Sequence, residues 1–127
     1  MNATSWALPS DPAMVGEARA MVRKTLTDWG LPHLVDDAEL VISELVTNAL
    51  IHGVGPVVMA LHDAGPALIG AVTDHCTTPP AARNPDFEDT GGRGMGIVRA
   101  LAASWGVWPY PTGKTIWFTL LRDGTST

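Results

Sequence analysis

Apolar residues recur along this chain at two spacings, and the spacing predicts the element that each segment forms. Residues 4–8 are typical of a short strand, which Pro9 ends. Spacings of three and four then predict a helix with an N-cap at Ser10 or Asp11 and an end at Gly30. The apolar positions of this helix are Val15, Ala18, Val22, Leu26 and Trp29.

A second helix is expected from about Pro32 to Gly53, because glycine is a natural helix end. Its apolar positions are Val35, Ala38, Ile42, Leu45, Val46 and Ala49. The spacing then changes, and residues 56–62 and 67–74 are typical of two strands. The turn-forming residues 63–66 between them predict a hairpin.

The last part of the chain begins with a polar segment. Residues 76–92 are rich in proline, glycine and acidic side chains, which is typical of a long exposed loop and often of a functional lid. A helix is expected from Gly94 to about Ala103, followed by strands at 104–110 and 114–121. The order of elements predicts the α/β class, as a two-layer α/β sandwich with a mixed, mostly antiparallel sheet and helices on one face.

Composition narrows the class of protein. The 127 residues fit one domain spanning 1–127, and 46% hydrophobic with 17% charged residues is a globular composition. The net charge of −5 and the lack of a basic stripe argue against direct binding of nucleic acid. A single cysteine, no signal peptide and no long apolar run predict a cytoplasmic protein that does not enter a membrane. Five tryptophans are expected mainly in the core: Trp6, Trp29, Trp105, Trp108 and Trp117.

Three polar residues follow one another at helical spacing on the second helix. Glu44, Asn48 and His52 are each four residues apart, so they share one stripe of the helix. A carboxamide oxygen suits Mg²⁺, and a carboxylate one turn away could deprotonate an attacking hydroxyl. A solvated helix edge explains the same spacing.

Asp74 ends the second hairpin strand, at the rim of the expected sheet. A carboxylate accepts hydrogen bonds, so it could recognise an exocyclic amine such as that of adenine. An aspartate that ends a strand and begins a turn is the alternative.

A glycine-rich run precedes the third expected helix: Gly92-Arg93-Gly94-Met95-Gly96. Glycines let backbone N–H groups approach a phosphate, and a helix N-terminus favours an anion. A dinucleotide fingerprint is not expected, because the segment before the run is polar and not a strand. A flexible hinge is the other interpretation.

The segment Thr112-Gly113-Lys114-Thr115 imitates the end of a P-loop. A P-loop requires glycine at the position of Trp108 and a helix after the motif, whereas the residues that follow are typical of a strand. A hairpin turn is expected here.

Taken in order, these motifs resemble those of one superfamily. The string from Glu44 to Gly53 resembles the N-box of the superfamily that contains DNA gyrase, sensor histidine kinases, the ninety-kilodalton heat-shock chaperone and mismatch-repair ATPases. Asp74 falls in the first glycine box, residues 92–96 resemble the second, and residues 113–115 resemble the third. Within this superfamily, the short chain resembles the bacterial anti-sigma-factor serine/threonine kinase family.

The resemblance implies a Bergerat-type sandwich that binds ATP and Mg²⁺. It implies that Glu44 is the general base, that Asn48 ligates Mg²⁺, and that Asp74 bonds the adenine amine with Thr115 nearby. The phosphate end of the site would be formed by Gly92, Arg93, Gly94, Met95 and Gly96.

The resemblance also implies a lid and partners. Residues 77–91 would be the ATP lid, from which Arg83 or Arg93 could reach the phosphates. The protein would phosphorylate an anti-sigma-factor antagonist and sequester a sigma factor, as a possible homodimer.

Two other functions stay open. The first glycine box of the family reads Asp-x-Gly, whereas this chain has Cys76 in the third position. This departure favours a nucleotide-binding regulatory module without kinase activity. The catalytic domain of a histidine kinase is less expected, because no dimerisation helix with a phosphoacceptor histidine is recognisable.

Overall fold

The computed structural model describes residues 2–75 and 92–124, and the side chains of residues 92–94 lie outside this description. Its elements are β1 (Ala3–Leu8), α1 (Met14–Asp28), the 3-10 helix η1 (Pro32–Leu34), α2 (Val35–His52), β2 (Val54–Asp63), β3 (Ala67–His75), α4 (Gly92–Leu101), β4 (Ser104–Tyr110) and β5 (Gly113–Leu121). The order agrees with the sequence prediction. None of the described helices is long and apolar enough to cross a membrane.

The first long helix begins later than predicted. Asp11 Oδ1 accepts a hydrogen bond from the backbone N–H of Ala13 at 2.9 Å, so the predicted capping residue closes a turn before the helix. As a result, α1 begins at Met14 and no side chain caps it. The second helix is also preceded by a separate 3-10 turn, so α2 begins at Val35 and not at Pro32.

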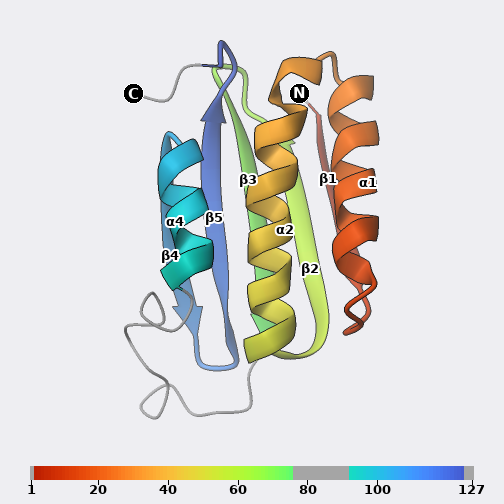
Figure 1. Cartoon of the computed structure of the whole chain (residues 1–127), viewed down its shortest axis with the longest axis vertical. Coiled ribbons are helices and arrows are strands. Elements are labelled where there is room, and N and C mark those ends of the chain that lie inside the picture. The colour runs from red at the N-terminus through yellow and green to blue at the C-terminus, as the bar shows by residue number, and fades with distance from the viewer. Residues whose placement is uncertain (1, 76–91, 125–127) are drawn as a thin grey trace.

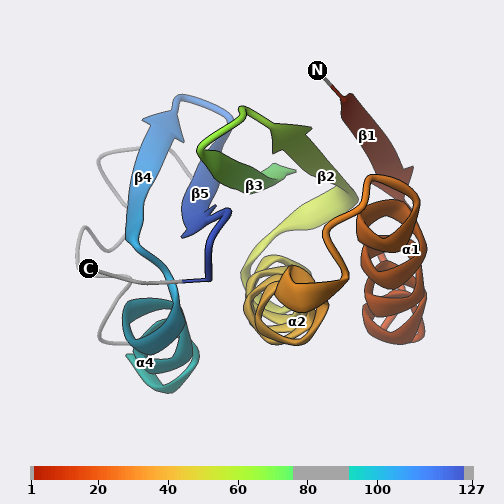
Figure 2. The same cartoon turned by 90° about the horizontal axis from the view of Figure 1, so that it is seen from above.

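The five strands form one sheet in the order β1-β2-β3-β5-β4, and each neighbouring pair is antiparallel. The helices α1, α2 and α4 lie in a row over one face of this sheet (Figures 1 and 2). This arrangement confirms the predicted two-layer α/β sandwich. The other face of the sheet carries no described helix (Figure 2).

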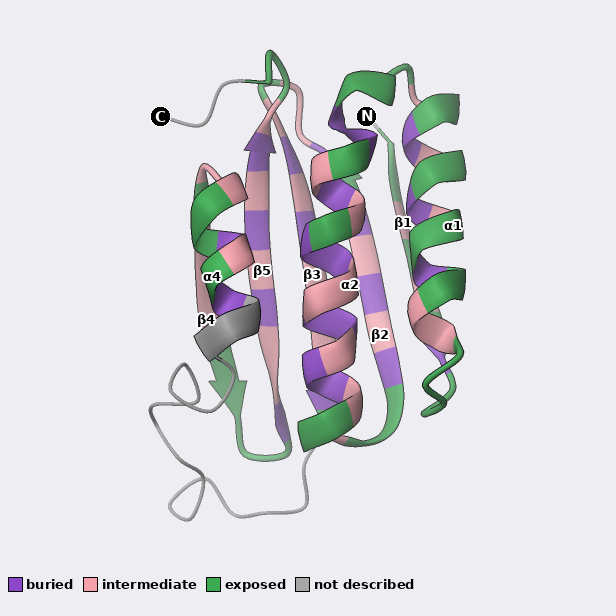
Figure 3. Ribbon diagram, in the orientation of Figure 1, coloured by how far each residue is buried: buried purple, intermediate pink, exposed green. Residues whose placement is uncertain are grey.

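The core lies where the helix layer meets the sheet (Figure 3). Alternate residues of each strand point to the helices, so Ile116, Phe118 and Leu120 of β5 are buried together. Burying a side chain of this size contributes about 1.5–3 kcal/mol. The helices supply the opposing residues, among them Ala18, Val22, Leu26, Val41, Ile42, Leu45 and Val46.

The tryptophans divide between core and surface. Trp6, Trp29 and Trp105 pack against the core. Trp108 is 65% exposed on β4, at the edge of the sheet, so the expectation of a core residue is wrong at this position. Its parity along β4 differs from that of Trp105, and it therefore points to the other face of the sheet.

The β2–β3 hairpin agrees with the predicted turn. Asp63 Oδ1 accepts the backbone N–H of Gly65 at 3.0 Å, and Gly65 has a φ of +93°. Arg122 Nη1 donates to both oxygens of Asp63, at 3.0 and 3.1 Å. The bond from Gly65 and then the bond from Arg122 hold the pKa of Asp63 below its ordinary value.

Candidate functional site

The polar stripe of α2 faces α4. Glu39 bonds Arg23 of α1 and so marks the α1-facing flank of the helix. Asn48 lies nine residues further along, a rotation of about 180° in an α-helix. Asn48 therefore occupies the opposite flank, against which α4 packs, and Glu44 lies one turn before it. The predicted pairing of Glu44 with Asn48 on one stripe agrees with this arrangement.

The two side chains of this stripe are not equally buried. Asn48 is 8% exposed, and its Oδ1 is buried without a hydrogen-bond partner among the described residues. Leaving such an acceptor unpaired costs about 1–3 kcal/mol, and native proteins rarely keep one without a use for it. Glu44 is half-buried, and no described side chain is paired with its carboxylate.

Asp74 lies on the inner face of the sheet. Its parity along β3 is that of Leu68 and Val72, and it is 3% exposed. Directly across the β3–β5 pair stands Lys114, whose Nζ donates to Asp74 Oδ2 at 2.5 Å. Asp74 Oδ1 is the other buried acceptor that lacks a described partner. An aspartate that merely began a turn would be exposed, so burial favours the binding interpretation.

Two glycines allow the neighbouring segments to close on Asp74. A Cβ atom at Gly53 would lie 2.7 Å from Ala49 O and 3.0 Å from Asp74 Cβ. A Cβ atom at Gly113 would lie 2.0 Å from Asp74 O. Gly53 ends α2 as predicted, but its φ is −100°, so glycine is required here by the close approach and not by a left-handed cap.

The glycine run does not precede a helix but forms its first turn. The helix α4 begins at Gly92, two residues before the predicted start. Its N-terminal end lies at the same end of the molecule as the C-terminal end of α2 (Figure 1). The first N–H groups of a helix have no partner within it, so this end suits a phosphate. A Cβ atom at Gly96 would touch nothing within 4 Å, so packing does not require glycine there.

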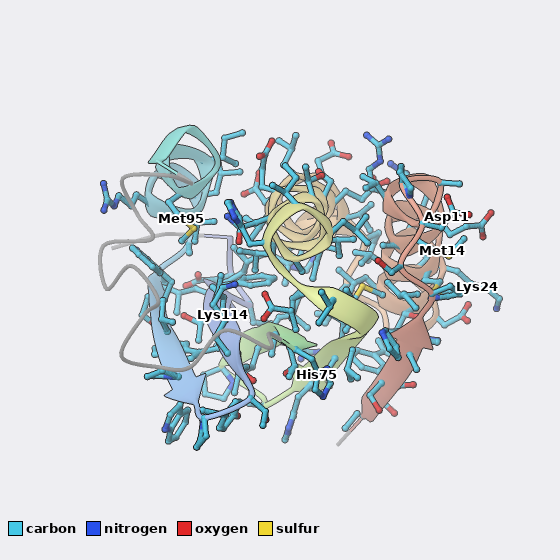
Figure 4. The ribbon with its side chains drawn as sticks, turned by 90° about the horizontal axis from the view of Figure 1, so that it is seen from below. Asp11, Met14, Lys24, His75, Met95 and Lys114 are labelled. Atoms are coloured by element: carbon cyan, nitrogen blue, oxygen red, sulfur yellow. The ribbon has the colours of Figure 1, made fainter. Side chains whose placement is uncertain are left out.

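Met95 belongs to the core and not to the surface of the glycine run. It is 1% exposed, and Figure 4 shows it with Lys114 in the space between α4 and the sheet. The side chain of Arg93, and Arg83, Cys76 and the proposed lid at 77–91, lie outside the described residues.

The structure does not bring Thr115 to Asp74. Thr115 Oγ1 bonds Thr73 Oγ1 at 2.7 Å and Tyr110 OH at 3.0 Å, and these residues have the outer parity of their strands. Lys114, and not Thr115, has the inner parity of β5 and stands opposite Asp74. The sequence carries a signal for this position. The apolar residues Ile116, Phe118 and Leu120 alternate along β5, and the same alternation, continued towards the start of the strand, places residue 114 on the inner face.

The chemistry of the described residues fits a nucleotide with a magnesium ion. Asn48 Oδ1 is an uncharged oxygen of the kind that Mg²⁺ accepts as a protein ligand. A carboxylate oxygen accepts hydrogen bonds and does not donate them, so Asp74 Oδ1 suits an amine as its partner. Asp74 Oδ1 is buried on the helix-facing side of the sheet and Asn48 Oδ1 on α2, and a bound ligand would satisfy both acceptors.

Comparison with known proteins identifies the family. The family model of the histidine kinase-like ATPase domain matches residues 8–120. The chain therefore belongs to this family, which confirms the superfamily resemblance and implies ATP binding. A search of the curated proteins found no match.

Proposed function

We propose that this protein is an ATP-dependent serine/threonine kinase that phosphorylates an anti-sigma-factor antagonist and sequesters a sigma factor. One observation supports the proposal most strongly. On the flank of α2 that faces α4, the half-buried carboxylate of Glu44 lies one turn from the unpaired side-chain oxygen of Asn48. A base beside an oxygen ligand for Mg²⁺ is the combination that transfer of a phosphoryl group to a hydroxyl requires.

Each residue then has a role in positioning. Bound Mg-ATP supplies the transferable phosphoryl group. Asn48 Oδ1 would hold the magnesium ion, and Asp74 Oδ1 would accept a hydrogen bond from the adenine amine. The first turn of α4, with Gly92, Gly94 and Gly96, would offer the backbone N–H groups of a helix N-terminus to the phosphates.

Glu44 accepts the proton of the incoming serine or threonine hydroxyl. Among the described residues its carboxylate has no hydrogen bond or ion pair, which is compatible with this task. Phosphoryl transfer depends mostly on positioning and charge neutralisation, so residues 1–127 suffice as one catalytic domain. The family resemblance further supports a homodimer, and the single cysteine is compatible with a cytoplasmic location.

Transfer assays with Glu44→Gln test the proposal. The wild type and this variant are incubated with labelled Mg-ATP and candidate antagonist proteins. Loss of a general base lowers transfer by about a hundredfold or more, while ATP binding stays within about threefold. Glu39→Gln is the matched control, because it changes the same residue type on the flank of α2 that faces α1. Equal transfer by Glu44→Gln and wild type would contradict the role of Glu44.

A nucleotide-binding regulatory module without kinase activity is the second candidate. Cys76 favours it, because a side chain replaces the glycine expected beside the base. The same assay separates the two functions. Saturable ATP binding by the wild type, without transfer to any antagonist, would favour the module and overturn the kinase.

A further inference from the structure

The pair formed by Lys114 and Asp74 is more buried than an ion pair of the surface. The side chain of Lys114 is 15% exposed and that of Asp74 is 4% exposed. Burying two charges gains little stability over an apolar pair of similar size, because both lose their hydration. A buried pair at the candidate site therefore calls for a reason other than stability.

The two carboxylate oxygens of Asp74 have different surroundings. Lys114 Nζ donates to Oδ2, whereas Oδ1 is buried and has no described partner. Rotating the carboxylate would break the bond to Lys114 or exchange the two oxygens. The register of β3 and β5 fixes both backbones, since Gly113 permits close contact with Asp74 O. Oδ1 is thus held as a fixed acceptor.

We infer that Lys114 is a positioning residue that makes the site select a base with an amino group at the sixth position of the purine ring. A fixed acceptor requires a donor opposite it, and the adenine amine supplies one. Guanine presents a carbonyl oxygen at the same place, which would set two acceptors against each other. This inference rests on the proposed nucleotide site, and it adds the residue that orients Asp74.

Two ligands that differ only in the amine test the inference. Mg-ATP and the magnesium complex of purine riboside triphosphate, which lacks the amine, are titrated calorimetrically into each variant. We expect the wild type to bind ATP at least about tenfold more tightly, because a hydrogen bond to a charged group is lost with the analogue. In Lys114→Met the ratio of the two dissociation constants, analogue over ATP, falls to about threefold or less. The affinity for the analogue changes less than the affinity for ATP.

Two further variants separate positioning from folding. Lys114→Arg keeps a cationic donor and is expected to restore most of the ratio. Arg122→Met is the matched control, because it removes the cation of the other buried aspartate pair, Arg122 with Asp63, and leaves the ratio unchanged. Where Lys114→Met does not fold, Lys114→Gln replaces it with the same expectation of a reduced ratio.

The outcomes distinguish the inference from the function on which it rests. A wild-type ratio of tenfold that stays unchanged in Lys114→Met or Lys114→Gln, with both ligands weakened equally, would overturn the role of Lys114 and leave the nucleotide site intact. A wild type that binds neither ligand would overturn the proposed function and the inference together. Selective loss of ATP binding supports both.

Discussion

Gly113 and the backbone of Asp74 lie so close that a Cβ atom on Gly113 would come within 2.0 Å of Asp74 O. The two residues belong to neighbouring antiparallel strands, where Gly113 stands opposite His75. Real Cβ atoms do not approach an oxygen at this distance, so any other residue would push β5 away from β3. The contact therefore holds the strand ends that carry Lys114 and Asp74.

Replacing this glycine should destabilise the fold. Gly113→Ala is expected to lower the free energy of unfolding by about 2–4 kcal/mol, because the backbone atoms that it meets cannot move aside as a side chain could. Urea denaturation measures the change. The control is Gly16→Ala, since Gly16 is exposed in α1 and a Cβ atom there would have no neighbour within 4 Å; this change should stabilise by about 0.5–1 kcal/mol. Equal stability of the two variants would refute the close contact.

Asp63 should make stability depend on pH in the acid range. Its pKa is lowered in the folded protein, so its stabilising effect is complete above the pKa of the unfolded chain and is lost as the pH falls through the lower folded value. The window therefore lies below about pH 4. Asp63→Asn should be less stable than the wild type at neutral pH and lose less stability in this window.

Urea denaturation between pH 7 and pH 3 measures this difference. Asp28→Asn is the control, because Asp28 is 61% exposed and its pair with Lys24 lies on the surface. Its acid profile should follow that of the wild type. An Asp63→Asn profile that also follows the wild type would show that Asp63 does not carry the effect.

Asn48 should serve binding and not stability. Asn48→Leu replaces a side chain whose buried Oδ1 is unpaired with an apolar one of similar size. The free energy of unfolding without ligand should therefore fall by no more than about 1 kcal/mol, or rise. The same change removes the magnesium ligand. The thermal shift that Mg²⁺ adds to that of ATP should therefore disappear.

Thermal unfolding with ATP, in the presence of Mg²⁺ or of a chelator, makes the comparison. Ser43→Ala is a control on the same helix, because its hydroxyl bonds the backbone of Leu40. Its magnesium response should equal that of the wild type. A full magnesium response in Asn48→Leu would exclude Asn48 as a ligand.

Local patterns predicted the elements, because each depends on neighbours in sequence. The spacing of apolar residues gave the helices and strands in order, and the turn chemistry of residues 63–66 gave the hairpin. The shared stripe of Glu44 and Asn48 follows from the same helical spacing, whereas the burial of Asn48 became clear only from the structure. The elements, the hairpin and the stripe needed no knowledge of distant contacts.

Contacts between residues far apart in the sequence were not predicted. The strand order β1-β2-β3-β5-β4 and the pairing of Asp74 with Lys114, 40 residues apart, depend on a register that no local pattern encodes. Motif matching placed Thr115 beside the base, whereas the alternation along β5 places Lys114 on the inner face. Strand parity was the more reliable guide, because the pleat decides which side chain meets the helices.

Calorimetric titration of Mg-ATP into the wild type, Asp74→Asn and Asp63→Asn tests the central claim most directly. Both variants change one buried aspartate to its amide, at different places in the sheet. We predict saturable binding to the wild type, a loss of about 1.5–3 kcal/mol in Asp74→Asn, and unchanged affinity in Asp63→Asn. No binding to the wild type, or equal affinity in all three proteins, would contradict a nucleotide site built on Asp74.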